Sequence, residues 1–199
     1  MADTQNDNTP VLEDLKREDD GYKAKDISLE EALQADAEDE SLRKWKESLL
    51  TEAGPIGGSK EVNLTSFSLV FGDGQAPISV PLNDPAALEE LSKNPIILKE
   101  GIAFRYKVTF TVSGDILSGL TFLASIYRLK IRAAKQEYVL GSYAPRQNEH
   151  EVVFPSGFDE YLYTPSGITG RGTYLTRCVF TDDDGKKYFD FSFHFKVVK

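Results

Sequence analysis

All twelve phenylalanines of this 199-residue chain lie after residue 60, so only that part can supply a large aromatic core. In the first 60 residues the only aromatic side chains are Tyr22 and Trp45, and sixteen acidic side chains stand against eight basic ones. A segment this acidic, with so little apolar surface, cannot offset the entropy lost on ordering. We therefore expect a flexible acidic arm over residues 1–58 and a folded domain over residues 59–199.

The arm holds two short helix predictions, at about 28–37 and 39–52. Ser28 and Glu31 form a capping box for the first, and Asp39 is placed to cap the second. Leu42, Trp45 and Leu49 then follow at helical spacing. A helix of about a dozen residues is marginal in water without tertiary support. Its apolar stripe is expected either to dock on a partner or to pack on the β-domain of the same chain.

Beyond residue 60 the apolar pattern repeats every two residues, as half-buried strands require. The alternation runs through 102–113, 174–180 and 189–195, and further strands are expected near 62–71, 77–82, 95–100, 118–128, 136–141 and 150–154. Turn signals near residues 72–74, 113–115 and 183–185 separate them. Seven to nine such strands predict an all-β domain, an antiparallel β-sandwich of immunoglobulin-like type.

Composition restricts the classes of function and partner. A single cysteine, Cys178, excludes an internal disulfide framework and fits a reducing cytosol. No apolar run approaches the roughly 20 residues that span a bilayer, and the acidic first residues do not read as a signal peptide. A net charge of −9 argues against nucleic acid as a partner and favours a basic partner surface. We expect a cytosolic protein.

We find no catalytic motif in the sequence. His150 lies between Glu149 and Glu151, and His194 lies on the polar side of the last strand, so both are interpreted as solvated surface histidines. Cys178 falls on the apolar side of its strand and is interpreted as a buried structural thiol. No residue pattern points to a catalytic group or a cofactor, the histidines and Cys178 show no metal-ligand cluster, and we expect a binding protein rather than an enzyme.

The run Asp182-Asp183-Asp184-Gly185 has three interpretations that the sequence leaves open. The carboxylates form a solvated turn, bind calcium through hard oxygen ligands, or capture an Arg or Lys of a partner. The last strand is also open to two interpretations, because Phe189, Phe191, Phe193 and Phe195 all face one way. They either fill a sandwich core or line a cavity for an apolar ligand.

Six short motifs follow one another along the chain: Asp39–Lys46, Leu98–Gly101, Leu117–Gly119, Tyr127–Arg128, Gly141–Arg146 and Phe180–Asp184. Together they resemble the Rho GDP-dissociation inhibitor family, from about Tyr22 to the C-terminus. The resemblance implies a protein that binds prenylated Rho-family small GTPases. Its arm would block GDP release, and its β-sandwich would sequester the geranylgeranyl lipid and so extract the GTPase from membranes.

The resemblance also implies roles for single residues. The residues that would contact the GTPase are Tyr22, Asp39, Ser41, Leu42, Trp45 and Asp184. Those that would contact the basic segment before the prenylated cysteine are Asp159 and Glu160. The residues that would line the isoprenyl pocket are Leu69, Phe110, Leu123, Phe191 and Phe193. The family often carries tryptophans in the last strand, where this chain has Phe191 and Phe193.

The partners implied are a GTPase in a 1:1 complex, with the chain a monomer on its own, and the lipid. Membrane contact is expected only transiently, during extraction and delivery. Two alternative functions stay open: a general carrier of prenylated or acylated proteins, in which the arm plays no part, and a calcium-dependent membrane-binding sandwich. Inhibition of nucleotide exchange separates the first alternative from the inhibitor, and lipid binding with and without calcium tests the second.

Overall fold

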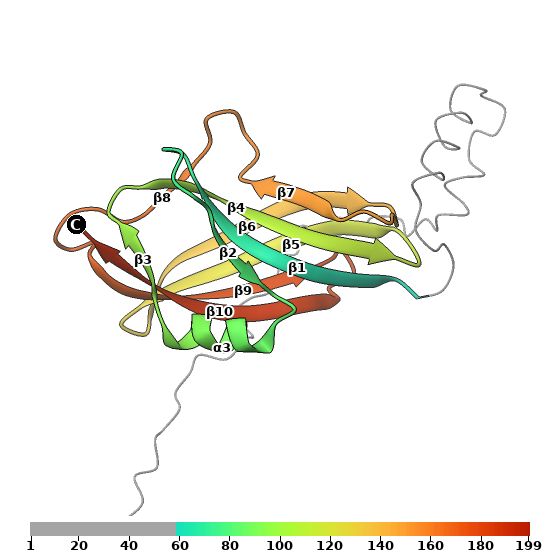
Figure 1. Ribbon diagram of the computed structural model, residues 1–199, viewed down its shortest axis with the longest axis horizontal. Helices are drawn as coiled ribbons and strands as arrows, with labels where there is room; N and C mark the ends of the chain where they lie inside the picture. Colours follow the sequence, from blue (N-terminus) through green and yellow to red (C-terminus); the bar gives the residue numbers. More distant parts are fainter. Residues whose placement is uncertain (1–58) are drawn as a thin grey trace, which may run out of the picture.

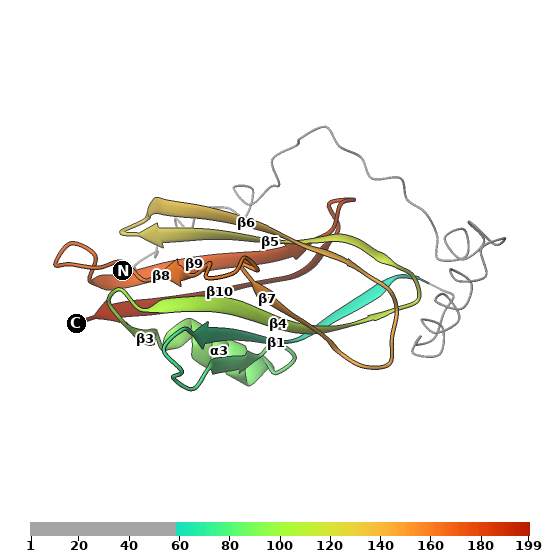
Figure 2. The same ribbon diagram turned by 90° about the horizontal axis from the view of Figure 1, so that it is seen from above.

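The computed structural model describes residues 59–199, which form two five-stranded sheets that lie over one another (Figures 1 and 2). The first sheet holds β2 (Ile78–Pro81), β1 (Glu61–Phe71), β4 (Ala103–Ser113) and β7 (His150–Phe154) in that order, with β8 (Leu162–Tyr163) also paired to β4. The second has the order β3 (Ile96–Lys99), β10 (Lys187–Val198), β9 (Gly172–Thr181), β5 (Leu117–Arg128) and β6 (Ile131–Tyr143). Only the β3–β10 pair is parallel. The all-β prediction is confirmed, whereas the immunoglobulin-like type stays a prediction.

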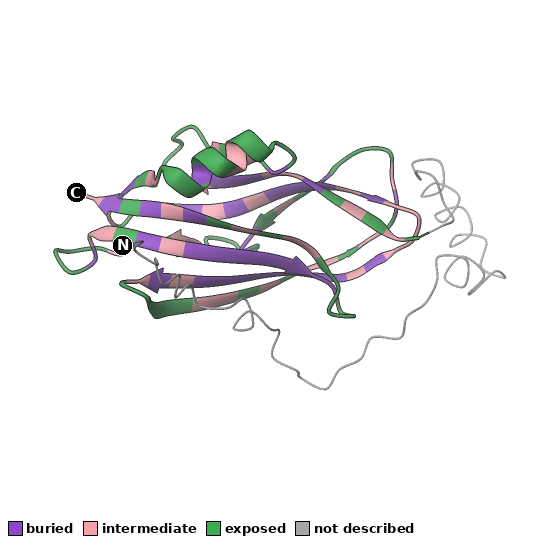
Figure 3. Ribbon diagram, turned by 90° about the horizontal axis from the view of Figure 1, so that it is seen from below, coloured by how far each residue is buried: buried purple, intermediate pink, exposed green. Residues whose placement is uncertain are grey.

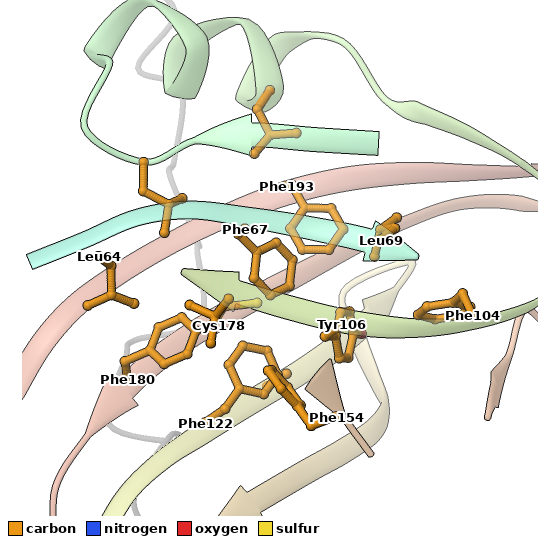
Figure 4. Close-up of a cluster of buried hydrophobic side chains, with 14 of the residues drawn as sticks. Leu64, Phe67, Leu69, Phe104, Tyr106, Phe122, Phe154, Cys178, Phe180 and Phe193 are labelled. Atoms are coloured by element: carbon orange, nitrogen blue, oxygen red, sulfur yellow. The ribbon is translucent and has the colours of Figure 1, made fainter. Parts of the chain in front are cut away.

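Phenylalanines from both sheets meet in the core, as Figure 4 shows around Phe67. The ring of Phe67 in β1 stacks on Phe122 of β5 with centroids 5.9 Å apart, and it contacts Phe191 of β10 at 5.2 Å. Alternate residues of a strand point to opposite faces, so one apolar face of each sheet is buried between the layers. Figure 3 shows that pattern as buried and exposed positions that alternate along the strands.

The last strand follows its predicted alternation. Phe193 and Phe195 are buried and Phe189 and Phe191 half-buried, all packed in the core, while Asp190 and the other residues between them lie on the opposite face. Cys178 is also buried in the core, and burial raises the pKa of its thiol well above the ordinary value. The interpretation of Cys178 as a structural thiol agrees with this position.

One helix, α3 (Pro85–Lys93), has no counterpart among the predicted elements. Asp84 caps it by accepting a hydrogen bond from the Ala86 backbone N–H at 2.9 Å, and Pro85 occupies the first turn. Leu91 is its buried residue, and the helix packs against β10 and β2. The helix therefore covers the sandwich beside these two strands, where the four-residue β2 alone would leave apolar surface exposed.

His150 corrects the prediction of a solvated histidine. Its side chain is buried, and its ring stacks on Phe110 with centroids 5.3 Å apart. Burial and the nearby charge of Arg146 lower the pKa of His150, although its contact with the Ala144 carbonyl works the other way. Glu149 and Glu151 flank it in the sequence, but alternation turns their side chains away from the core.

The predictions for residues 1–58 lie outside the described residues. They comprise the flexible arm, its two helices, and the GTPase contacts of Tyr22, Asp39, Ser41, Leu42 and Trp45. Within residues 59–199, no helix is long and apolar enough to cross a bilayer. In the same range, no three His, Cys, Asp or Glu side chains gather as a metal site would require.

Candidate functional site

An apolar cavity of about 350 Å³ lies between the two sheets, toward the ends of β5 and β10. Its lining residues come mainly from eight strands, and the large side chains among them include Leu69, Tyr106, Ile126, Tyr174, Phe193 and Phe195. Tyr174 and Phe195 lie flat on one another, with centroids 4.9 Å apart and planes 5° apart. Flat rings that stack on each other rather than on the opposite sheet leave space between the layers.

The cavity reaches the surface between β6 and β8, the edge strands of the two sheets. Ala133 and Ala134 of β6 and Tyr163 of β8 line it and are exposed, so small side chains lie on the β6 side of the opening. Gln136 lies deeper on the same strand, and its Oε1 accepts a hydrogen bond from the Tyr106 hydroxyl at 3.2 Å. This buried polar pair satisfies itself within the otherwise apolar wall.

A network of polar contacts fixes the loop of residues 164–171 at one end of the cavity. Arg171 binds both carboxylate oxygens of Glu100, with N–O distances of 2.9 and 2.8 Å. These hydrogen bonds lower the pKa of Glu100, against the effect of desolvation. Arg128 lies over the Tyr174 ring at 5.3 Å and donates to the backbone carbonyls of Thr169 and Arg171. The loop is thus tied to both β3 and β5.

The five predicted lipid-contacting residues fall in different places. Leu69 and Phe193 line the cavity. Phe191 is half-buried beside Phe193, with ring centroids 6.1 Å apart. Phe110 is fully buried outside the cavity lining, against His150 and Tyr143. Leu123 belongs with Val179 to a separate buried cluster, because its neighbour Phe122 takes the inner face of β5.

Phe195, one of the four last-strand phenylalanines for which a cavity was considered, also lines the cavity. Tyr106 and Tyr174 were not named as cavity residues from the sequence, although the alternation already indicated that their side chains face inward. Ala133 and Ala134 are the less visible members, because two small residues at the start of a strand carry no signal of their own. Their place in the lining follows from the register of β6 against β5, which pairs Ala134 with Ile126, another lining residue.

The acidic run 182–184 divides into three environments. The Asp182 side chain is 0% exposed and lies 3.0 Å from Lys60 Nζ, and it accepts a hydrogen bond from the Tyr188 hydroxyl at 2.6 Å. Asp183 lies over Gly119, whose φ is +58° and where an added Cβ would come within 2.1 Å of the carboxylate. Asp184 is 59% exposed and only 3.5 Å from Lys60. The solvated-turn interpretation is therefore wrong for Asp182.

The electrostatics of Asp182 follow from these contacts. Burial alone would raise the pKa of its carboxyl, but hydrogen bonds from Tyr188, Lys60 and the Lys186 backbone lower the pKa below its usual value. In return, the pairing with Asp182 raises the pKa of Lys60, against the effect of desolvation. Lys60 lies at the start of the described chain, so this pair anchors the point where residues 1–58 join the domain.

Asp159 and Glu160 are exposed in the loop between β7 and β8. Arg105 of β4 holds the loop, because its guanidinium donates to the carbonyls of Glu160 at 2.8 Å and Gly157 at 3.1 Å. Phe158, in the same loop, is 98% exposed. The two carboxylates therefore stand a few residues before β8, whose Tyr163 lines the mouth of the cavity.

A sandwich with an apolar cavity and with exposed carboxylates in the loop before β8 is suited to binding an apolar ligand, and sequence comparison shows its family. The profile of the family described as RHO protein GDP dissociation inhibitor matches residues 6–199. The chain is 33% identical over 177 residues to the Homo sapiens Rho GDP-dissociation inhibitor 1, covering 86% of this chain and 82% of that protein. With the Mus musculus Rho GDP-dissociation inhibitor 3 it shares 34% over 203 residues, covering 100% and 87%.

A Schizosaccharomyces pombe Rho GDP-dissociation inhibitor is 35% identical over 175 residues, covering 86% of this chain and 82% of that protein. The chain belongs to the Rho GDP-dissociation inhibitor family, whose members are regulatory proteins rather than enzymes. The resemblance inferred from the six short motifs is confirmed.

Proposed function

We propose that this inhibitor acts in two parts on a prenylated Rho-family GTPase in the cytosol. The arm of residues 1–58 blocks GDP release, and the sandwich holds the geranylgeranyl group and so takes the GTPase off the membrane. The observation that carries the second part is the apolar cavity between the sheets, which opens at the β6–β8 edge. Its volume of about 350 Å³ lies within the range of small-molecule sites in proteins.

The energetics of lipid transfer agree with this assignment. Burial of a twenty-carbon chain at about 0.8 kcal/mol per carbon has an upper limit of roughly 16 kcal/mol, close to what the bilayer offers. The transfer is therefore nearly balanced, and contacts between the proteins decide its direction. In this proposal, Asp159 and Glu160 meet the basic segment before the prenylated cysteine, and Asp184 meets a basic residue of the GTPase.

The exposure of Asp159, Glu160 and Asp184 supports these roles, because their carboxylates are open to a partner without rearrangement of the core. Each Lys or Arg of the basic segment that binds anionic lipid gains about 1 kcal/mol at the membrane surface. The segment loses this free energy when it leaves the bilayer, and carboxylates near the cavity mouth compensate for the loss. The partner is a single GTPase, and the complex is a 1:1 heterodimer.

The test is extraction of a prenylated Rho-family GTPase from liposomes. Ala134→Trp puts a large ring into the open mouth of the cavity at an exposed position, and Ala86→Trp on α3 is the matched control. We expect Ala134→Trp to lose extraction yet still slow nucleotide release at high concentration, because arm and cavity act on different steps. Wild-type extraction by Ala134→Trp contradicts the assignment of lipid to this cavity.

The Leu123→Trp variant tests whether the lipid lies instead at a second position, on the other side of β5. Leu123 faces away from the cavity, so a lipid against it would lie on the other side of β5. A folded Leu123→Trp variant that fails to extract, while Ala134→Trp extracts normally, would place the lipid there. A general carrier is separated by deletion of residues 1–58, because it would still bind lipidated proteins and have no effect on nucleotide release.

A further inference from the structure

We infer that the tip of the β5–β6 hairpin is a docking surface for an anionic bilayer. The tip comprises Leu129, Lys130, Ile131 and Arg132, which are all exposed. The exposed fractions of the two aliphatic residues are 87% for Leu129 and 73% for Ile131. Two aliphatic side chains alternate here with two cations, the pattern of segments that lie in a membrane interface.

The backbone conformation of the tip does not explain why this sequence occurs there. Strands β5 and β6 pair up to Arg128 and Ile131, which leaves Leu129 and Lys130 as a two-residue turn. Their φ values of 49° and 66° are those of a type I′ turn, which strongly prefers Asn-Gly. A leucine in this left-handed conformation is strained and almost fully exposed, so the turn would be more stable with other residues.

The tip has a rigid base and lies at the cavity mouth. Arg128, directly opposite Ile131, lines the cavity and donates a hydrogen bond to the Arg171 carbonyl at 2.7 Å. Ala133, which immediately follows Arg132, lines the cavity too. Ile168 is 86% exposed next to Thr169, whose carbonyl also accepts from Arg128, so a third aliphatic side chain stands beside the hairpin.

The charge and the exposed aliphatic side chains of the tip together indicate the class of partner. Among the residues that the structure describes, no carboxylate pairs with Lys130 or Arg132, although the whole chain carries a net charge of −9. Cations alone would suit any polyanion, but phosphates of nucleic acids and acidic peptides gain nothing from exposed Leu and Ile side chains. An anionic bilayer offers headgroups to the cations and acyl chains to the aliphatic residues.

The docking surface needs no GTPase, but its link to lipid exchange rests on the proposed function. Contact through two cations and two or three aliphatic side chains is weak and reversible, as a single lipid anchor is. Such contact brings the cavity mouth to the bilayer surface without holding the protein there. Extraction and delivery both require that combination.

The test uses the full chain and vesicles of phosphatidylcholine with or without phosphatidylserine. An environment-sensitive dye is attached at Ile131→Cys, and the native Cys178 does not compete because it is buried. The control is Val139→Cys on the same strand, 62% exposed and about 27 Å farther along it. We expect a blue shift at position 131 with phosphatidylserine vesicles only, reversed by high salt, and none at position 139.

Two variants complete the test. The double variant Leu129→Asn/Lys130→Gly creates the preferred Asn-Gly turn, so it should raise the melting temperature while it weakens vesicle binding at least tenfold. Lys130→Gln/Arg132→Gln should weaken binding roughly 30-fold, whereas Lys93→Gln/Lys187→Gln, with the same charge change elsewhere, should not. No blue shift at position 131, an equal shift at 139, or an equal response to soluble polyglutamate overturns the inference. Extraction by Ala134→Trp tests the proposed function separately.

Discussion

The Asp182→Asn substitution tests how much the ion pair at the point where residues 1–58 join the sandwich contributes to stability. The substitution keeps the shape of the side chain but removes its charge, which leaves Lys60, 17% exposed, without its buried partner. Loss of one member of a buried pair costs about 3–5 kcal/mol of unfolding free energy. Asp184→Asn is the matched control, because Asp184 is 59% exposed and surface pairs contribute about 0–1 kcal/mol.

Urea unfolding measures the difference between these two variants. With a slope of about 2 kcal/mol per M, the expected loss lowers the urea midpoint of Asp182→Asn by about 1.5–2.5 M. In the double variant Lys60→Met/Asp182→Asn the loss should be smaller than the sum of the single losses, because the two side chains interact directly. Equal midpoints for Asp182→Asn and Asp184→Asn would refute the pairing as a source of stability.

The pH dependence provides an independent check. Hydrogen bonds from Tyr188, Lys60 and the Lys186 backbone outweigh burial and hold the folded-state pKa of Asp182 below its ordinary value. Its contribution to stability is therefore fully present above about pH 4 and is lost as pH falls through the folded-state pKa. The gap between wild type and Asp182→Asn should be constant from pH 5 to 8 and shrink below pH 4. A gap unchanged at pH 2.5 contradicts this reasoning.

Two further predictions concern His150 and the carboxylates proposed to contact the GTPase. Burial lowers the pKa of His150 in the folded protein, so stability should fall as pH drops below about 6.5, where the unfolded chain takes up the proton first. Urea unfolding at pH 5–7.5 should show this slope flattened in His150→Gln and kept in His194→Gln. Asp39→Ala and Asp184→Ala should each weaken GTPase binding by roughly 1.5–3 kcal/mol without unfolding the domain, as measured by calorimetry and circular dichroism. Wild-type inhibition of nucleotide release by both variants would contradict that assignment.

The strands could be predicted because alternation is a local signal. Strands such as β4 and β10 carry an apolar face that identifies them, and Phe191 to Phe195 fell on the expected side of β10. The same rule explains the error at His150. Glu149 and Glu151 indicated a polar site, yet both side chains are exposed while His150, at the start of β7, points to the inner face and meets Phe110. Helix α3 was missed although Asp84-Pro85 is a known helix start.

The cavity and the Asp182 pair could not be predicted, because both depend on contacts between distant segments. Lys60 and Asp182 are far apart in the sequence, and nothing in either neighbourhood indicates the other. The open mouth depends on the register that sets Ala134 opposite Ile126, and on the polar loop that fixes Arg171 to Glu100. The predictions for the arm rest on residues outside the described range, and they stay predictions.

The two sides of the cavity mouth carry opposite charge, and this arrangement gives the proposed exchange a direction. The hairpin tip presents Lys130 and Arg132, and the loop before β8 presents Asp159 and Glu160. Toward an anionic bilayer, the first side is attracted and the second repelled, so the protein should approach with the β5–β6 hairpin first. In the proposed function, the repelled carboxylates are left to meet the basic segment of the GTPase rather than the lipid headgroups.

Charge reversal on the acidic side of the mouth separates attraction to the membrane from contact with the basic segment of the GTPase. Asp159→Lys/Glu160→Lys should bind phosphatidylserine vesicles more tightly, because the mouth then becomes cationic on both sides. It should nevertheless extract the GTPase less well, because the basic segment loses its acidic partner and stays with the headgroups. Vesicle sedimentation and liposome extraction measure the two effects on the same variant. If both increase together, membrane affinity alone limits extraction, and the acidic pair has no part in holding the basic segment.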